Sequence, residues 1–553
     1  MRPHWPALLL SFALALSALA QQPSSRSSKP APDKEQPPAA ESSKASAKEP
    51  QAAARPGEEA KPEAARESAE KKDDERYDMT EVPPVITHHQ ISIDGKPLRY
   101  TATAGRLPIK RDDGRIDAEM FFVAYTVDGQ EPARRPLLFA FNGGPGSASV
   151  WLHMGALGPK RVVLQSKGFM PASPYRMTEN QYSLLDRTDL VLVDAIGTGF
   201  SRAANAELSK KFWGVKGDIE AFGEFIRLYL SRYERWSSPL FLLGESYGTT
   251  RAAGVAGYLA DRGISFNGIT LLSEVLKYQT LQGTKSNDEP YILILPSYTM
   301  IAAYHKRLAP ELTQDLAKTR REVEQWASTD YFMALAKGDA LTPDERQRIT
   351  DQMARYTGLS KQVIDEANLR VSVAVFTHNL LLDQKVRVGR LDGRFTGPDP
   401  EGLLDTRFYD PTNSAILPPF TSIFNNYVRT ELGFKSDMPY RVSAFQDSGG
   451  ARDKWDWGTA IDGFPDTATA LRSAMVKNPY VKVLVMEGYY DLATPFYAAD
   501  YTMDHLGLSP AYRKNISFAT YDCGHMVYLD LASLAKMKRD QVEFMERTLP
   551  GGP

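Results

Sequence analysis

The chain has 553 residues, 42% of them hydrophobic, and a formal net charge of −2 at pH 7. This near-neutral balance argues against a nucleic-acid-binding protein, which would normally carry an excess of Lys and Arg. The single cysteine, Cys523, excludes intramolecular disulfides and zinc sites built from several thiolates. The length allows several domains, or one large α/β domain with an insertion, and the composition can build a conventional core.

Residues 1–20 have the pattern of a secretory signal peptide. Arg2 precedes an apolar run from Ala7 to about Leu16, and the segment 18–20 supplies the small residues that a signal peptidase requires. The run is too short to cross a bilayer of roughly 30 Å. We therefore expect a periplasmic or extracellular protein with a cleavable signal peptide and no stable membrane insertion.

Residues 21–76 contain no Val, Ile, Leu, Met, Phe, Tyr, Trp or Cys and consist mostly of Ala, Pro, Ser, Glu and Lys. Nothing in such a segment can be buried to offset the conformational entropy lost on folding. We expect a disordered linker here, and globular sequence from Tyr77 to the end of the chain.

Beyond Tyr77, short apolar runs bounded by polar or turn residues predict strands that are buried on both faces of a parallel sheet. These runs are 135–141, 189–194, 239–243, 268–272 and 481–486. Helical patterns lie between and after them, at 217–235, 249–262 and 529–549. This alternation indicates an α/β fold with a mostly parallel, doubly wound sheet.

The stretch from about 287 to 443 differs from its surroundings. It is charged and largely helical by pattern, with few strand-like runs. We interpret it as a helical cap inserted into a single α/β domain that spans residues 77–553.

The sequence Gly244-Glu245-Ser246-Tyr247-Gly248 follows the predicted strand 239–243 directly. G-x-S-x-G alone would arise by chance about once in several chains of this length. Here an apolar strand precedes it and an Ala-rich helix follows, which is the context of a nucleophile elbow. In such a turn the glycines relieve crowding and the serine hydroxyl is exposed at a helix N-terminus. The alternative is an ordinary N-capping serine.

The loop Phe141–Gly146, with the sequence FNGGPG, also ends a predicted strand. Its glycines allow backbone N–H groups to approach a ligand closely, so the loop can supply half of an oxyanion hole. The N–H of Tyr247 would supply the other half. The alternatives are a tight turn or a phosphate-binding loop, but neither the P-loop nor the dinucleotide-binding pattern is matched.

Asp491 and His525 each follow a strand-like segment near the end of the chain. The order Ser246, Asp491, His525 is the order of a catalytic triad in α/β hydrolases. A serine needs an imidazole base, and the base needs a carboxylate that orients it. The other histidines considered lack such a position and are predicted to be structural: His153, His305, His378 and His505. No spacing of His, Asp and Glu indicates a metal site, and we expect neither a metal nor another cofactor.

Several motifs occur in the order found in the serine carboxypeptidase family, which the chain resembles from about Tyr77 to its end. They are FNGGPG at 141–146, GTGFS at 197–201, GESYG at 244–248, Gly488 with Asp491, and GHM at 524–526. The resemblance implies an α/β-hydrolase fold with a helical insertion, and a bacterial-type secreted member. It implies that Ser246 is the nucleophile, His525 the base and Asp491 its orienting partner. Gly144 and Tyr247 would provide the N–H groups of the oxyanion hole.

The resemblance also implies that Asn142, Gly143 and Glu245 bind the terminal carboxylate of the substrate. Two carboxylates can share a dry pocket only if one is protonated, so Glu245 would be kept protonated and donate to the substrate. The chain departs from the family in three respects. The position of a second acid that the family often has in this site is Ala156, the cysteine that usually follows NGGPG is Ser147, and the disulfides of eukaryotic members are absent.

The sequence therefore predicts an exported serine carboxypeptidase that acts on peptides through an acyl-enzyme. An esterase or acyltransferase with the same triad is the nearest alternative, and it would not need Glu245 or Asn142 to face a carboxylate. A non-catalytic binding protein would not need an intact triad, and a capped pocket would obstruct the long chains cut by an endopeptidase.

Overall fold

A computed structural model describes residues 77–399, 409–444, 455–458 and 463–549. All of them belong to the compact unit Glu67–Pro553. The predicted signal peptide and linker, residues 1–76, lie outside the described residues, so both stay predictions.

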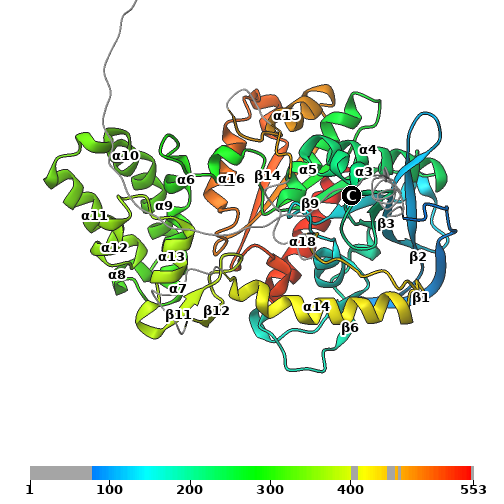
Figure 1. Cartoon of the computed structure of the whole chain (residues 1–553), viewed down its shortest axis with the longest axis horizontal. Helices are drawn as coiled ribbons and strands as arrows, with labels where there is room; N and C mark the ends of the chain where they lie inside the picture. The colour runs from blue at the N-terminus through cyan, green and yellow to red at the C-terminus, as the bar shows by residue number, and fades with distance from the viewer. Residues whose placement is uncertain (1–76, 400–408, 445–454, 459–462, 550–553) are drawn as a thin grey trace, which may run out of the picture. The chain divides into compact units, whose positions relative to one another are not determined.

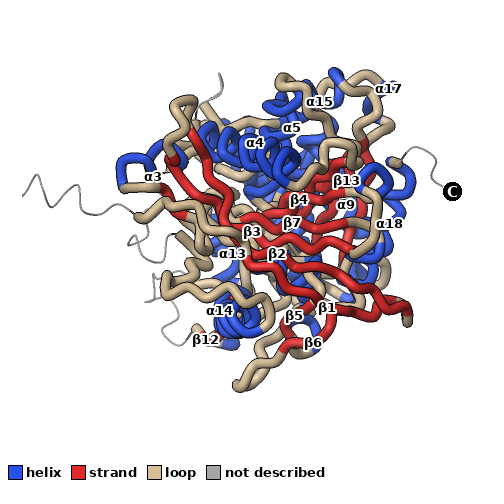
Figure 2. The backbone as a smooth tube through the Cα atoms, turned by 90° about the vertical axis from the view of Figure 1, so that its right-hand side faces the viewer, coloured by secondary structure: helices blue, strands red, loops and turns tan. Residues whose placement is uncertain are grey.

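One large sheet forms the centre of this unit (Figures 1 and 2). In spatial order its strands are β1 (Val85–Ile93), β2 (Lys96–Lys110), β3 (Ile116–Val127), β7 (Asp189–Val193), β4 (Leu137–Phe141), β9 (Leu240–Glu245), β10 (Gly268–Leu272), β13 (Lys482–Gly488) and β14 (Ile516–Tyr521), with β8 (Arg202–Ala203) beside β3. The strands from β7 to β14 run parallel. β1, β2 and β3 pair antiparallel with their neighbours.

The parallel strands are buried on both faces, as their unbroken apolar sequences predict. In β4, Leu138 and Ala140 enter one core, whereas Leu137, Phe139 and Phe141 enter the core on the opposite face. Successive side chains of a strand point to opposite sides, so such a run needs cover on both.

Helices supply that cover (Figure 2). One face packs against α4 (Val215–Arg232), α5 (Tyr247–Ala260) and α15 (Ala468–Lys477), and the other against α14 (Pro411–Thr430) and α18 (Leu531–Thr548). The remaining elements outside the 287–443 stretch are α2 (Val150–Leu152), α3 (Ala206–Phe212), α16 (Phe496–Asp504), α17 (Pro510–Arg513) and the short pair β5 (Lys160–Val162) and β6 (Met177–Glu179). The predicted α/β-hydrolase fold, with its doubly wound and mostly parallel sheet, is confirmed.

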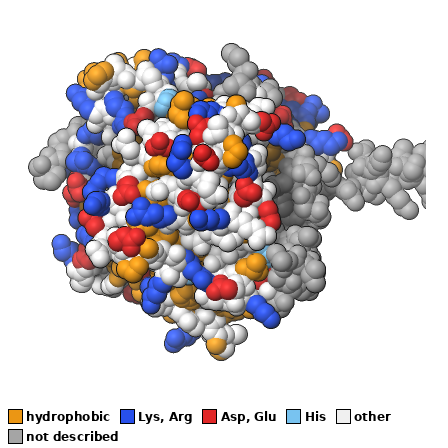
Figure 3. Space-filling model, turned by 90° about the vertical axis from the view of Figure 1, so that its left-hand side faces the viewer, with side chains coloured by type: hydrophobic (Ala, Val, Ile, Leu, Met, Phe, Trp, Pro, Cys, Tyr) orange, Lys and Arg blue, Asp and Glu red, His pale blue; other side chains and the backbone are white. Residues whose placement is uncertain are grey.

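The segment predicted as a cap is largely helical in the structure. It contains α6 (Glu289–Leu293), α7 (Leu295–Tyr304), α8 (Pro310–Thr313), α9 (Leu316–Trp326), α10 (Phe332–Lys337), α11 (Pro343–Thr357), α12 (Lys361–Glu366), α13 (Val373–Asn379), the hairpin β11 (Val386–Val388) and β12 (Thr396–Pro398), and α14. Lys, Arg, Asp and Glu are intermixed over its outer face (Figure 3).

The helices from α6 to α13 share a hydrophobic core of their own. That core also takes in Tyr490, Leu492 and Phe496, which come from the segment after β13. The chain around Asp491 is therefore packed between the sheet and these helices. The status of residues 287–443 as an inserted domain stays a prediction.

A fully buried ion pair lies beneath the turn between β9 and α5. The Arg251 guanidinium donates to both carboxylate oxygens of Asp218, at 2.8 and 3.1 Å, and to the carbonyl oxygen of Asn142 at 2.5 Å. The Tyr247 hydroxyl donates to the same carboxylate at 3.1 Å. Arg251 thereby joins α4, α5 and the FNGGPG loop, so removing it should loosen all three.

We predict that Arg251→Met lowers the free energy of unfolding by about 3–5 kcal/mol, because Asp218 would stay buried without a counter-charge. The double variant Asp218→Asn/Arg251→Met should lose less than the single one. Arg227→Met is the matched control, because it breaks an exposed pair with Glu224 on α4 and should cost at most about 0.5 kcal/mol. Urea unfolding measures all three, and a loss below 1 kcal/mol for Arg251→Met would contradict the prediction.

Candidate active site

Ser246 occupies a sharp turn between β9, which ends at Glu245, and α5, which begins at Tyr247. Its backbone has φ 61° and ψ −132°, a conformation that costs energy for a residue with a side chain and is typical of nucleophile elbows. The glycines on either side are required by space, since a Cβ atom on Gly244 would overlap the carbonyl oxygen of Gly248. The predicted strand–turn–helix context is therefore present.

The FNGGPG loop lies directly against the N-terminus of α5. A Cβ atom on Gly143 would be 2.5 Å from the Tyr247 amide nitrogen, and Gly144 has φ +102°. Tyr247 opens the helix, so its N–H has no acceptor within the helix. The N-terminal end of a helix also favours negative charge. The loop and the helix thus bring backbone donors together where an oxyanion would develop.

His525 and Asp491 are brought together as predicted. The Nδ1 atom of His525 lies 2.7 Å from Oδ2 of Asp491. The carboxylate of Asp491 is fully buried and accepts hydrogen bonds from the Ala493 N–H and from the N–H and hydroxyl of Thr494. These donors hold Asp491 in one orientation and keep a negative charge beside the imidazole.

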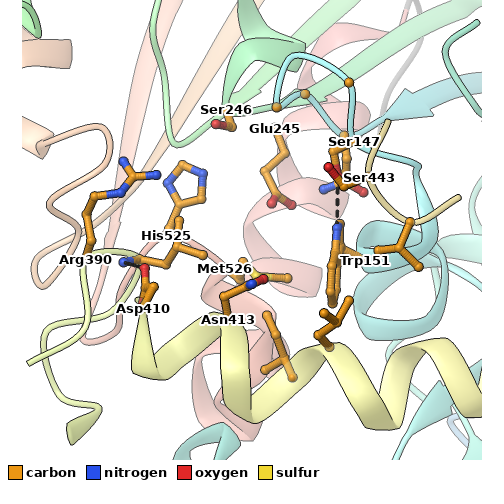
Figure 4. Close-up of a pocket in the computed structure, with 18 of the residues that line it drawn as sticks. Ser147, Trp151, Glu245, Ser246, Arg390, Asp410, Asn413, Ser443, His525 and Met526 are labelled. Atoms are coloured by element: carbon orange, nitrogen blue, oxygen red, sulfur yellow. Dashed lines mark hydrogen bonds between the residues drawn. The ribbon is translucent and has the colours of Figure 1, made fainter. Parts of the chain in front are cut away.

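Burial alone would lower the pKa of His525, but the charge and the hydrogen bond of Asp491 outweigh it and raise the pKa above the ordinary 6.5. Ser246 and His525 line the same pocket and are drawn there in Figure 4. Among the described residues no hydrogen bond joins them, and in enzymes such a bond often tightens only with substrate bound.

Two charged residues that the sequence analysis missed position the His525 loop. The carboxylate of Asp392 accepts a hydrogen bond from the Gly524 N–H at 3.0 Å and binds the Arg394 guanidinium at 2.6 Å. Arg394 also donates to the carbonyl oxygen of Asp522 at 2.8 Å. The only signal in the sequence is a pair of opposite charges two residues apart, which is common on protein surfaces.

A pocket of about 580 Å³ opens beside Ser246 and His525 (Figure 4). Its apolar wall includes Trp151, Ile416, Leu417, Val442 and Met526. The indole N–H of Trp151 donates to the Ser147 hydroxyl at 3.0 Å, so the residue in place of the family's cysteine orients a wall of the pocket.

Glu245 and Asn142, two of the residues predicted to bind the substrate carboxylate, both line this pocket. Glu245 is 3% exposed, and its Oε2 atom has no hydrogen-bond partner among the described residues. Burial raises the pKa of Glu245 to about 7, although the charge of His525 and the nearby Tyr528 and Asn142 side chains oppose the rise. The side-chain oxygen of Asn142 accepts from the Leu152 N–H at 2.9 Å, which leaves its amide nitrogen for another partner.

The residue at the position of the missing second acid, Ala156, is buried in the apolar core. Tyr528 lies beside Glu245, and its side chain opposes the rise in the pKa of that carboxyl. Sequence reasoning missed Tyr528 because a tyrosine three residues after His525 carries no distinguishing pattern.

A second cavity, of about 350 Å³, borders Ser246 together with Gly144, Tyr247 and Arg390. Its other lining is mostly apolar: Val275, Tyr278, Leu281, Pro290, Ile294, Val373, Trp457 and Leu492. Ser246 therefore stands between two cavities. One contains Glu245 and Asn142, and the other combines apolar residues with Arg390.

The competing histidines do not line either cavity. Each of the four contacts another residue: His153 contacts Tyr125, His305 contacts Gly393, His378 contacts Asp399 and His505 contacts Tyr501. Burial lowers the pKa of His153 to about 3, which suits a structural role. Across the described ranges, no group of three or more His, Cys, Asp or Glu side chains could hold a metal ion. Nor is any described helix long and apolar enough to span a membrane.

The chain has the α/β-hydrolase fold with a serine at the strand–helix elbow, and comparison with known proteins shows which family it resembles. Residues 95–265 match the model of the serine carboxypeptidase family. The predicted resemblance to that family is confirmed over this segment, which contains the FNGGPG loop and Ser246. Asp491 and His525 lie outside it.

Individual proteins are also similar to parts of the chain. The chain is 27% identical over 177 residues to serine carboxypeptidase-like 33 of Arabidopsis thaliana, covering 31% of this chain and 34% of that protein. It is 31% identical over 156 residues to the pheromone-processing carboxypeptidase KEX1 of Saccharomyces cerevisiae, covering 26% of this chain and 20% of that protein. Among solved structures, a proline iminopeptidase of Mycobacterium smegmatis is 12% identical, with a TM-score of 0.34 over 84% of this chain and 98% of its own.

We predict that Ser246→Ala abolishes covalent labelling by a serine-directed phosphonate and lowers hydrolysis by a factor on the order of 10⁴–10⁶. Folding should change little, because only one hydroxyl is removed. Ser328→Ala on the exposed cap surface is the control and should be labelled like the unaltered protein. Labelling and peptide hydrolysis measure the effect, and more than a few per cent of residual activity would place the nucleophile elsewhere.

Proposed function

We propose that the protein is an exported serine carboxypeptidase, a hydrolase that releases the C-terminal residue of peptides through an acyl-enzyme. The elbow serine, the Asp491–His525 pair and the match to the family over residues 95–265 support a serine hydrolase. The pattern of residues 1–20 supports export. The choice of a peptide with a free C-terminus depends on Glu245 and Asn142.

In the proposed reaction the Ser246 hydroxyl oxygen attacks the carbonyl carbon of the last peptide bond, and its proton passes to Nε2 of His525. The oxyanion is held by the N–H groups of Gly144 and Tyr247. The C–N bond then breaks as His525 returns the proton to the leaving nitrogen. Water, activated by the same imidazole, hydrolyses the ester to release the shortened peptide. Asp491 keeps its negative charge throughout and stabilises the imidazolium.

The observation that carries the proposal is the buried, partly unpaired carboxyl of Glu245 directly before the nucleophile. A carboxyl with a raised pKa is neutral in mildly acidic solution and can donate a hydrogen bond to a carboxylate. The Asn142 amide nitrogen is a second donor, and the backbone of Gly143 allows close approach. An ester or amide substrate would leave these groups without partners, at a cost of about 1–3 kcal/mol each.

The two cavities fit the two sides of the scissile bond. With the terminal carboxylate against Glu245, the departing residue would occupy the pocket walled by Trp151 and Met526. The residue that forms the acyl-enzyme would extend into the second cavity, beside the oxyanion donors. This arrangement supports removal of one residue at a time from the C-terminus.

We predict that a peptide with a free C-terminus is cut at least about 100-fold faster, in kcat/KM, than the same peptide with a C-terminal amide. Loss of two hydrogen bonds to buried groups corresponds to a few kcal/mol, and each 1.4 kcal/mol to a factor of ten. Chromatography of both peptides after incubation gives the ratio. Equal rates, together with rapid hydrolysis of simple esters, would instead favour an esterase or acyltransferase.

For the free-acid peptide, kcat/KM should fall above about pH 7, where Glu245 loses its proton and repels the substrate carboxylate. It should fall again on acidification, as His525, whose pKa is raised, takes up a proton and ceases to be a base.

Glu245→Gln donates a hydrogen bond but does not titrate, so this variant should lose the alkaline fall and keep the acidic one. The matching amidated peptide serves as the control, since it should show no alkaline fall near pH 7 with either protein. An unchanged alkaline fall in Glu245→Gln would remove Glu245 from carboxylate binding.

A further inference from the structure

The backbone at Arg390 is held by both loops of the proposed triad. Its carbonyl oxygen accepts a hydrogen bond from the N–H of Leu492, next to Asp491, at 3.0 Å. The following carbonyl, of Leu391, accepts from the N–H of His525 at 2.6 Å. The N–H of Leu391 donates to Asp410 at 3.0 Å. The position from which the Arg390 side chain starts is therefore fixed relative to the reacting groups.

The guanidinium itself has no counter-ion. In the described part of the chain, Arg390 forms no ion pair and its side chain makes no hydrogen bond, whereas Arg251 and Arg394 nearby are paired with Asp218 and Asp392. Arg390 is partly buried and lines both cavities that border Ser246.

Two acids in this part of the structure have other partners: Asp410, which lines the first cavity with Arg390, and Asp491, which precedes Leu492. Asp410 accepts hydrogen bonds from the backbone N–H groups of Leu391 and Thr412. Asp491 is enclosed by His525 and by the donors that follow it. Neither acid neutralises the guanidinium, which leaves a cation available to a ligand in the site.

A guanidinium that extends from a fixed backbone position and has no counter-ion among the described residues is suited to bind a carboxylate, because its planar donors match the two oxygens of the anion. A partly desolvated cation gains most from an anion that displaces the remaining water around it. The ligand chemistry that this position favours is therefore a negatively charged group of the substrate.

Figure 4 shows where Arg390 lies relative to Ser246, His525 and Glu245. Arg390 and Glu245 stand on opposite sides of the line from Ser246 to His525. If Glu245 takes the terminal carboxylate, Arg390 faces the other half of the substrate, in the cavity that also contains Leu492 and Thr494.

We infer that Arg390 forms an anion-binding subsite for the residue that supplies the scissile carbonyl, so that the enzyme favours peptides with Asp or Glu in the penultimate position. This inference rests on the proposed carboxypeptidase activity. It specifies the penultimate residue of the substrate, which neither the triad nor the terminal carboxylate site determines.

The test compares three free-acid peptides that share a C-terminal residue and differ only in the penultimate one: Glu, Gln or Lys. The unaltered protein should cut the Glu peptide at least about tenfold faster, in kcat/KM, than the Gln peptide. Arg390→Gln should bring this ratio close to one while still cutting the Gln peptide. Arg390→Glu should reverse the preference, so that the Lys peptide is cut faster than the Glu peptide.

Arg348→Gln removes the same charge from the exposed surface of α11 and should leave the ratio unchanged. Equal rates on Glu and Gln peptides with the unaltered protein would overturn the subsite and leave the carboxypeptidase proposal intact. An equal loss on all peptides in Arg390→Gln, with loss of the preference for a free C-terminus, would show that Arg390 binds the terminal carboxylate instead. Failure to cut any of the three peptides would overturn the proposed function itself.

Discussion

The close approach of three backbone segments around Ser246 is the constraint on which the rest of the site depends. Gly143 lies against the first amides of α5, and Gly244 lies against the carbonyl of Gly248. Gly248 lies against the carbonyl of Phe141, and a Cβ atom on Gly248 would be 2.7 Å from that oxygen. No side chain fits at these points. Because β4 and β9 are neighbours in the sheet, this contact brings the FNGGPG loop to the helix N-terminus and places both the proposed oxyanion donors and the Asn142–Glu245 pair beside Ser246.

The buried charged groups on the two sides of this contact differ in how many of their atoms have hydrogen-bond partners. Beneath it, the Asp218–Arg251 pair is fully satisfied and ties the loop to α4 and α5. Above it, Glu245 is left without a full set of partners, and burial keeps its pKa near 7. The first arrangement supports the fold, whereas the second costs stability and is useful only to a ligand that completes it. A buried group left incomplete beside a strained serine is what a site built for substrate is expected to contain.

The parallel strands, the elbow and the Asp491–His525 contact could be predicted because each has a local signal: an unbroken apolar run, a glycine spacing, or a polar residue just after a strand. The antiparallel strands β1 to β3 were not singled out, since β1 alternates buried and exposed positions and carries His88 and His89. Tyr528, Arg390 and the Asp392–Arg394 pair could not be found either, because their neighbours come from distant parts of the sequence: Asp392 and Gly524, for example, are 132 residues apart. Arg390 in particular belongs to the stretch predicted only as a helical cap.

The most direct test of the account is digestion of a mixed peptide library in H₂¹⁸O, followed by mass spectrometry of the products. The account predicts peptides shortened from the C-terminus, with ¹⁸O in the new terminal carboxyl group and none in the first residue released. That distribution requires both exopeptidase recognition and hydrolysis of an acyl group by water. Internal cleavage, or peptides left intact by a protein that hydrolyses simple esters, would contradict the account.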